Sequence, residues 1–381
     1  MKRHVQRAGA ILAPATLILC SLPDTLAGES SGSPVVEILG LDSPGGPGGI
    51  TPYAVSNNGN IIALHGDFAG LGPRYPGFWT PENGVEPMKA GDFADMVEGA
   101  ISADGSTIVG TVNGPGGSRA FRWRGPGTFE RFQPPAGIGL TTASTINSDG
   151  SRFGGSTIFT TTLEAYFSNA QDELVSLGPS RVGGISATGE LIAGHEFTPG
   201  GARSWYWTQD TGRVYISGLG PSVNARATGV SADGSTIFGS WSALPSRGIE
   251  PTPSGFAWSF ETGLRDLSNF GESFLQPTLI ASTGDGSVIA GHAWDGSFGG
   301  PAIWLTGSSA PIDGVEYIES LGYEFPDGLI AIRITDMTDD GLTFVGTGFY
   351  DGENVGWVAR VPTPSSLMLF GISIVAARRR R

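Results

Sequence analysis

The chain has 381 residues, including 61 glycines and 26 prolines, yet 39% of it is hydrophobic and 10% aromatic, which is enough apolar material for a core. We therefore assign the glycines to turns and exclude a disordered chain. Charged residues make up only 15%, and the formal net charge of −14 gives a surface that repels nucleic acid and anionic membranes, so no nucleic-acid partner is expected.

The first 28 residues have the pattern of a secretory signal peptide. Three basic residues precede an apolar run over residues 8–22, and small residues surround Ala27. This order predicts cleavage after Ala27 or Gly28. The only cysteine, Cys20, lies inside the apolar run, so the exported chain has no disulfide framework and depends on packing and hydrogen bonds.

A turn motif then recurs along the chain, most clearly as SADGST at residues 102–107 and 231–236. Asp or Asn precedes the turn glycine in six of seven copies, and such pairs favour a hairpin because glycine adopts positive φ without a Cβ clash. The copies are 39 to 55 residues apart, as repeating β-structural units often are. The turn glycines are Gly59, Gly105, Gly150, Gly189, Gly234, Gly286 and Gly341.

Each turn precedes a short apolar run, such as residues 61–63 and 108–110, which predicts a buried strand. One large aromatic residue follows 16 to 24 residues after each turn, and we expect it to pack in the core rather than to form a line of sugar-stacking sites. These aromatic residues are Trp79, Trp123, Phe167, Trp207, Trp258, Trp304 and Trp357.

A further apolar segment closes six of the seven units and predicts a fourth strand. These segments cover residues 85–88, 129–132, 174–177, 214–219, 264–267 and 315–321. The seventh unit lacks one, whereas residues 35–41 supply a similar segment at the other end of the chain. The sequence therefore predicts an all-β, seven-bladed β-propeller of four-stranded blades over residues 35–361, closed by an N-terminal strand. A β-solenoid and an unclosed repeat array are the alternatives.

The units resemble the bacterial extracellular HAF repeats. The matching stretches are AISADGSTIVG (100–110) with RAFRW (119–123), and GVSADGSTIFG (229–239) with GFAW (255–258) and RDLSNFG (265–271). The resemblance implies an exported bacterial protein and supports the repeat fold; the family carries no assigned activity.

Three histidines occupy the same place, six residues after the turn glycine: His65, His195 and His292. A functional interpretation places them around the channel, where imidazoles could bind a metal. We favour a strand position that accepts any polar side chain, because the other blades have Thr or Ser there and no carboxylate accompanies the histidines at a fixed spacing. The turn aspartates suggest calcium, but they lie in separate blades. No nucleophile, phosphate-loop or paired-cysteine motif is present, so no cofactor, metal or enzymatic activity is expected.

The C-terminal residues resemble the PEP-CTERM sorting signal of Gram-negative bacteria. A Pro-containing start precedes an apolar run over residues 367–377, which is too short for a permanent span, and then a basic cluster. Thr363 stands where that family has an acidic residue. The resemblance implies an exosortase-type processing enzyme as a partner, transient membrane contact and a cell-surface or extracellular location. The signal residues are Val361, Pro362, Thr363, Pro364, Arg378, Arg379, Arg380 and Arg381.

Together these features predict an exported propeller that serves as a binding or structural module, with exopolysaccharide or biofilm matrix as the candidate partner. The alternative is a polysaccharide hydrolase or lyase acting at the channel face of the propeller.

Overall fold

The computed structural model describes residues 35–41, 49–68, 71–88, 94–114, 117–125, 128–132, 140–159, 162–169, 172–219, 223–243, 253–271, 275–295 and 298–360. All of them belong to one compact unit, Ser33–Val361. The predicted signal peptide (1–28) and sorting tail (361–381) lie outside the described residues. In the part of the chain that the structure describes, no helix has both the length and the apolarity required to cross a lipid bilayer.

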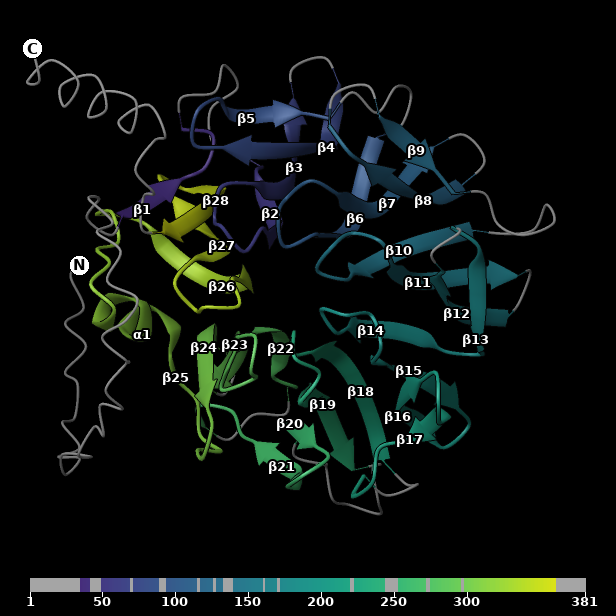
Figure 1. The fold of residues 1–381 in the computed structure, drawn as a ribbon. Coiled ribbons are helices and arrows are strands. Elements are labelled where there is room, and N and C mark those ends of the chain that lie inside the picture. Colours follow the sequence, from purple (N-terminus) through teal and green to yellow (C-terminus); the bar gives the residue numbers. More distant parts are fainter. Residues whose placement is uncertain are drawn as a thin grey trace, which may run out of the picture. The chain divides into compact units, whose positions relative to one another are not determined.

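Seven four-stranded antiparallel sheets form a ring, so the predicted seven-bladed β-propeller is confirmed (Figure 1). Blade 1 consists of β2 (Thr51–Val55), β3 (Ile62–Phe68), β4 (Gly72–Thr80) and β5 (Gly84–Pro87). Blade 2 consists of β6 (Ala94–Ile101), β7 (Ile108–Gly114), β8 (Gly117–Trp123) and β9 (Phe129–Arg131). Blade 3 consists of β10 (Leu140–Ile146), β11 (Phe153–Phe159), β12 (Thr162–Ser168) and β13 (Leu174–Gly178).

The remaining blades continue in chain order. Blade 4 consists of β14 (Arg181–Ile185), β15 (Ile192–Thr198), β16 (Gly201–Thr208) and β17 (Gly212–Tyr215). Blade 5 consists of β18 (Val223–Val230), β19 (Thr236–Ala243), β20 (Ser254–Ser259) and β21 (Gly263–Leu267). Blade 6 consists of β22 (Thr278–Ser282), β23 (Val288–Asp295), β24 (Phe298–Leu305) and β25 (Ile312–Asp313). The first strand of each blade lies nearest the axis (Figure 1).

Blade 7 joins the two ends of the propeller. Its first three strands are β26 (Ile330–Met337), β27 (Phe344–Tyr350) and β28 (Glu353–Arg360), and its outermost strand is β1 (Val35–Ile38). β1 pairs antiparallel with β28, with Val36 opposite Ala359. The buried Arg360 donates to Glu37 Oε1 (2.9 Å), and its guanidinium lies 5.1 Å from the Trp79 ring of blade 1. The predicted closure by the N-terminal strand is therefore confirmed.

The recurring turn joins the first and second strands of each blade and has one hydrogen-bond network. In blade 2 the Ser102 hydroxyl donates to Asp104 Oδ1 (2.7 Å), which also accepts from the Ser106 N–H (2.9 Å). Ser102 Oγ accepts from the Thr107 N–H (3.0 Å), and Gly105 has a φ of 76°. In all seven turns the side chain of the residue before the glycine accepts a hydrogen bond from the main-chain N–H of the residue after it. The turn glycines have φ values between 67° and 76°. The sequence motif therefore recurs because each blade has the same hydrogen-bonded turn between its first and second strands.

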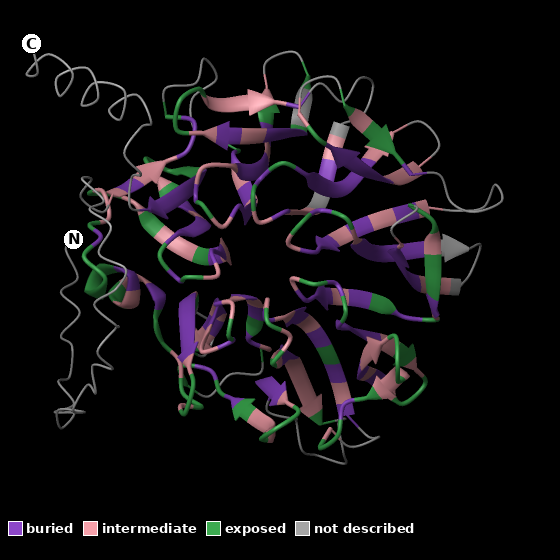
Figure 2. Ribbon diagram, in the orientation of Figure 1, coloured by how far each residue is buried: buried purple, intermediate pink, exposed green. Residues whose placement is uncertain are grey.

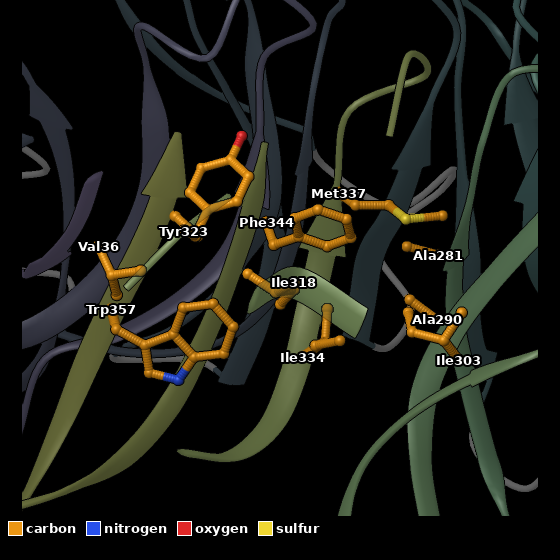
Figure 3. Packing of buried hydrophobic residues seen from close by; sticks show 11 residues of the cluster. Val36, Ala281, Ala290, Ile303, Ile318, Tyr323, Ile334, Met337, Phe344 and Trp357 are labelled. Atoms are coloured by element: carbon orange, nitrogen blue, oxygen red, sulfur yellow. The ribbon is translucent and has the colours of Figure 1, made fainter. Parts of the chain in front are cut away.

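Six of the seven predicted aromatic residues of the third strands are buried in the core, whereas Trp207 is half-buried and Trp205 is the fully buried aromatic residue of its strand. Trp123 of blade 2 lies 4.9 Å from Phe78 of blade 1, measured between ring centroids, and the Trp304 indole of blade 6 donates to the Ser268 carbonyl after blade 5 (2.9 Å). Buried residues lie along the strands of every blade (Figure 2). Between blades 6 and 7, Trp357 packs in one cluster with Val36 of β1 (Figure 3).

One predicted strand is wrong. Residues 315–321 were expected to form the last strand of blade 6, but Gly314–Ser320 is the helix α1, and the outermost strand is the two-residue β25. Asp313 caps the helix, since its Oδ1 accepts from the N–H groups of Val315 (2.8 Å) and Glu316 (3.2 Å). Ile318 points into the cluster between blades 6 and 7 and is fully buried (Figure 3). The apolar residues of this segment therefore belong to a short helix, in which Ile318 faces the core.

Candidate functional site

A central channel of about 520 Å³ is lined by residues from the innermost strands of all seven blades. Its walls are made largely of small side chains and backbone, for example Gly183 and Gly184 of β14. A Cβ on Gly183 would approach the Ala227 carbonyl oxygen of β18 to 2.2 Å, so glycine permits the close approach of these two strands. The titratable side chains in this lining are Tyr53, Arg181, His195, Asp336 and Asp339.

One mouth of the channel is bounded by the seven turns, which are hydrogen-bonded to one another. We call these seven hydrogen-bonded turns the turn belt. Each turn donates a main-chain N–H to a carbonyl of the next: Asn57 to Ala103, Ala103 to Ser148, Ser148 to Ala187, Ala187 to Ala232, Asp233 to Gly284, and Gly284 to Asp339 (2.7–3.0 Å). Between blades 7 and 1 side chains take over: the Asp339 N–H donates to Asn57 Oδ1 (3.2 Å), and Asn57 Nδ2 donates to Asp339 Oδ2 (2.5 Å).

Asp336 lies at the same junction, two residues before the turn of blade 7. Its Oδ2 accepts from the Val55 N–H of blade 1 (2.8 Å). Burial raises the pKa of Asp336 to about 7, with a further contribution from Asp339, although the main-chain N–H groups of Val55 and Met337 oppose the rise. Burial also raises the pKa of Asp339 despite its hydrogen bond from Asn57. The junction therefore holds two carboxyl groups that bind protons more tightly than usual.

Sequence reasoning missed Asp336, although a signal was present. The equivalent position in the other six blades holds a small residue: Ala54, Ala100, Thr145, Gly184, Gly229 and Ala281. An acid at a position otherwise reserved for small side chains marks an exception in the repeat.

The three candidate histidines lie on the second strands, β3, β15 and β23. His195 Nδ1 is 3.4 Å from the Ala227 carbonyl oxygen and His292 Nδ1 is 3.0 Å from that of Ile332, in each case on the innermost strand of the next blade. Burial lowers the pKa of all three, to about 4 for His65 and His195, so the imidazoles are neutral at neutral pH.

The structure does not bring the three histidines together as a metal site. Of the three, His195 lines the channel. Within the described ranges, no group of three or more His, Cys, Asp or Glu side chains is placed to hold a metal ion. The turn aspartates each serve their own turn, and hydrogen bonds from Ser106 and Ser102 lower the pKa of Asp104. Each turn aspartate therefore acts as a hydrogen-bond acceptor within its own blade.

Three exposed arginines share one place on innermost strands, away from the turn belt, and we call them the arginine mouth: Arg181, which lines the channel, Arg226 and Arg333. They come from the innermost strands β14, β18 and β26, each four residues before the strand ends at the turn belt, or about 13 Å along a strand. The channel thus has an acidic junction at one end and arginines toward the other.

No protein-family model matches the sequence, and no curated protein matches it. Among solved structures, an oligogalacturonate lyase in complex with manganese is similar at 14% identity and a TM-score of 0.57, covering 84% of this chain and 92% of that one. An oligogalacturonate lyase from Vibrio parahaemolyticus is similar at 13% identity and a TM-score of 0.52, covering 82% and 91%. TolB from Acinetobacter baumannii has 13% identity and a TM-score of 0.44, covering 68% of this chain and 61% of TolB.

At these identities the likeness concerns the fold alone. The chain is a seven-bladed β-propeller closed by its own N-terminal strand, with an open channel along its axis.

Proposed function

We propose that the protein is an exported binding module without catalytic activity that holds a carbohydrate, with exopolysaccharide as the candidate, at its central channel. The observation that carries this proposal is the channel of about 520 Å³, framed by strands from all seven blades. A cavity of this size suits a ligand of several sugar rings. The titratable side chains in its lining come from blades 1, 4 and 7, and blades 5 and 6 separate His195 from Asp336 and Asp339, an arrangement that suits recognition more than catalysis.

Export and surface retention are part of the proposal and rest on the two ends of the chain. Residues 1–28 have the order of a secretory signal, and residues 361–381 resemble the PEP-CTERM signal that an exosortase-type enzyme would process. Cell fractionation tests this: the chain is expected in the envelope or the medium. Replacing Arg378, Arg379, Arg380 and Arg381 with glutamine is expected to change its retention, and cytoplasmic accumulation of the unaltered chain would contradict export.

A glycan array tests the binding role. The chain spanning residues 29–361 is expected to retain at least one class of polysaccharide, and to leave that polysaccharide unchanged in length after prolonged incubation. Failure to retain any glycan would contradict the proposed function.

A second candidate function is cleavage of a polysaccharide by hydrolysis or elimination. It is favoured by the presence of His195 and Asp336 in the lining of the same channel. Because the pKa of His195 is lowered to about 4 and that of Asp336 is raised to about 7, a neutral base and a protonated acid coexist near neutral pH. Release of new sugar ends that is abolished by chelation or by replacing His195 and His292 would establish this alternative in place of the binding role.

A further inference from the structure

The three arginines of the arginine mouth share one place in their blades. By strand register, Arg181 lies opposite His195, Arg226 opposite Ser240 and Arg333 opposite Thr347. Blades 1, 3 and 6 have threonine at this place: Thr51, Thr142 and Thr278. Among the residues that the structure describes, none of the three arginines forms an ion pair within 4 Å. Three arginines therefore gather over blades 4, 5 and 7 of an acidic protein, while blade 2 has Glu98 at the same register position.

An aromatic side chain accompanies the arginines at the junction of blades 4 and 5. Phe197 is 53% exposed, and the guanidinium groups of Arg181 and Arg226 lie 5.9 and 5.6 Å from its ring centroid. His195 supports Phe197 edge-on, with 5.2 Å between the ring centroids. Because Phe197 is about half exposed beside these two guanidinium groups, its exposed part is available to a ligand that the two arginines flank.

A similar His–x–aromatic pair lies at the junction of blades 6 and 7. His292 packs edge-on against the half-buried Trp294 (4.7 Å between centroids), as His195 packs against Phe197. In both junctions the histidine Nδ1 faces the carbonyl of a residue next to an arginine: Ala227 follows Arg226, and Ile332 precedes Arg333. Arg333 contributes to lowering the pKa of His292, after burial, as Arg226 does for His195. The His–x–aromatic pair of one blade and the arginine of the next thus form a unit that occurs twice.

The chemistry of this repeated unit indicates its ligand. Guanidinium groups bind carboxylates through paired hydrogen bonds, and exposed aromatic rings stack on the apolar faces of sugars. Two such histidine, aromatic and arginine groupings, two blades apart, suit a ligand whose groups also repeat. We propose that the arginine mouth binds an acidic polysaccharide, with carboxylates of successive uronic acid residues on Arg226 and Arg333 and a sugar face on Phe197. This inference rests on the proposed binding function and names the class of its ligand.

Uronate is favoured over nucleic acid because the protein as a whole carries a net charge of −14. A double-stranded nucleic acid carries a phosphate charge about every 1.7 Å along its axis and extends beyond three arginines onto a repelling surface. A uronic acid polymer carries one carboxylate on each sugar residue and offers apolar ring faces to the exposed part of Phe197.

The experiment compares two forms of one polymer. Binding of the purified chain to polygalacturonate and to its methyl ester, measured by biolayer interferometry, is expected to favour the free acid by about tenfold or more. The double variant Arg226→Gln/Arg333→Gln is expected to lose this preference. The matched variant Arg124→Gln/Arg131→Gln, which removes two exposed charges from blade 2, is expected to keep it. Phe197→Ala is expected to weaken binding to both forms.

The outcomes separate the ligand class from the binding function. Equal affinity for acid and ester, unchanged affinity in Arg226→Gln/Arg333→Gln, or equal binding of single-stranded DNA would overturn the acidic-polysaccharide inference while leaving carbohydrate binding in place. Retention of no glycan of any kind would overturn the proposed function itself. Circular dichroism melting of each variant confirms that it is folded before its affinity is compared.

Discussion

The carboxylate of Asp336 accepts a hydrogen bond from the main-chain N–H of Val55 (2.8 Å), although the two residues are 281 positions apart in the chain. This contact joins the innermost strand of the last blade to that of the first. It lies beside the paired side chains of Asn57 and Asp339, which complete the turn belt at the same junction. The propeller is therefore closed twice: at its rim by β1 on β28, and at its axis by these polar groups.

The raised pKa of Asp336 predicts a pH-dependent contribution to stability. In the folded protein the carboxyl holds its proton up to about pH 7, whereas in the unfolded chain it loses it near 3.8. The folded state therefore binds more protons between these values, and this contribution to stability is lost as pH rises from about 4 to 7. Asp336→Asn keeps an acceptor for the Val55 N–H and removes the titration. We expect the variant to match the wild type at pH 4 and to be more stable above pH 7 by roughly 1–2 kcal/mol.

Urea unfolding of both proteins at pH 4 and pH 8 measures this effect. The quantity of interest is the difference in unfolding free energy between variant and wild type, since the other titrating groups are common to both. A difference that stays constant across the two pH values would contradict a proton held by Asp336.

The turn network predicts which substitutions a blade tolerates. Asp104→Ala removes the acceptor for the Ser102 hydroxyl and the Ser106 N–H, and we expect a loss of about 1 kcal/mol in the free energy of unfolding. Asp104→Asn keeps an acceptor oxygen, as Asn58 does in blade 1, and is expected to recover most of that loss. Thermal unfolding of the pair at pH 7 tests this. Equal destabilisation by Ala and Asn would show that the carboxylate charge, rather than the acceptor, stabilises the turn.

Arg122 links two blades through charge. It is 2% exposed, donates to Glu130 of its own blade 2 (2.7 Å), and makes two hydrogen bonds to Asp172 of blade 3 (2.6 and 2.9 Å). The partner carboxylates are about half-exposed and regain water when the arginine is removed, so the cost stays moderate. We expect Arg122→Met to lower the free energy of unfolding by about 1–2 kcal/mol. The exposed neighbour Arg124→Met is expected to change it by less than about 0.5 kcal/mol, and equal effects would argue against the inter-blade link.

The blade count could be predicted because each blade repeats the same local chemistry. The turn motif, with its acceptor side chain and glycine, depends on residues no more than five positions apart, so every copy is readable in the sequence. Five of the seven predicted aromatic residues of the third strands lie opposite the residue three positions after the turn glycine, whereas Phe167 and Trp357 are shifted by one and two positions. The contribution of residues 35–41 followed from counting, since one unit lacked a final strand.

The site could be predicted only in part because it depends on contacts between blades. Arg226 and Arg333 each lie eight residues before the turn glycine of their blade, a spacing that is readable in the sequence, but their neighbours His195 and His292 come from the preceding blades. The helix α1 was missed for a local reason. Residues 315–321 occupy the place of a final strand in their unit, which predicts a strand, whereas the Asp313 cap begins a helix there.

Closure by β1 is tested most directly with a disulfide across the last blade. Val36 lies opposite Ala359, and the chain from residue 29 onward contains no other cysteine. The double variant Val36→Cys/Ala359→Cys is expected to form an intramolecular disulfide under mild oxidation and to melt at a higher temperature oxidised than reduced. The variant Val36→Cys/Val358→Cys, shifted by one residue onto the opposite face of β28, is expected not to cross-link. Cross-linking of neither variant, or of both equally, would contradict a propeller latched by its N-terminal strand.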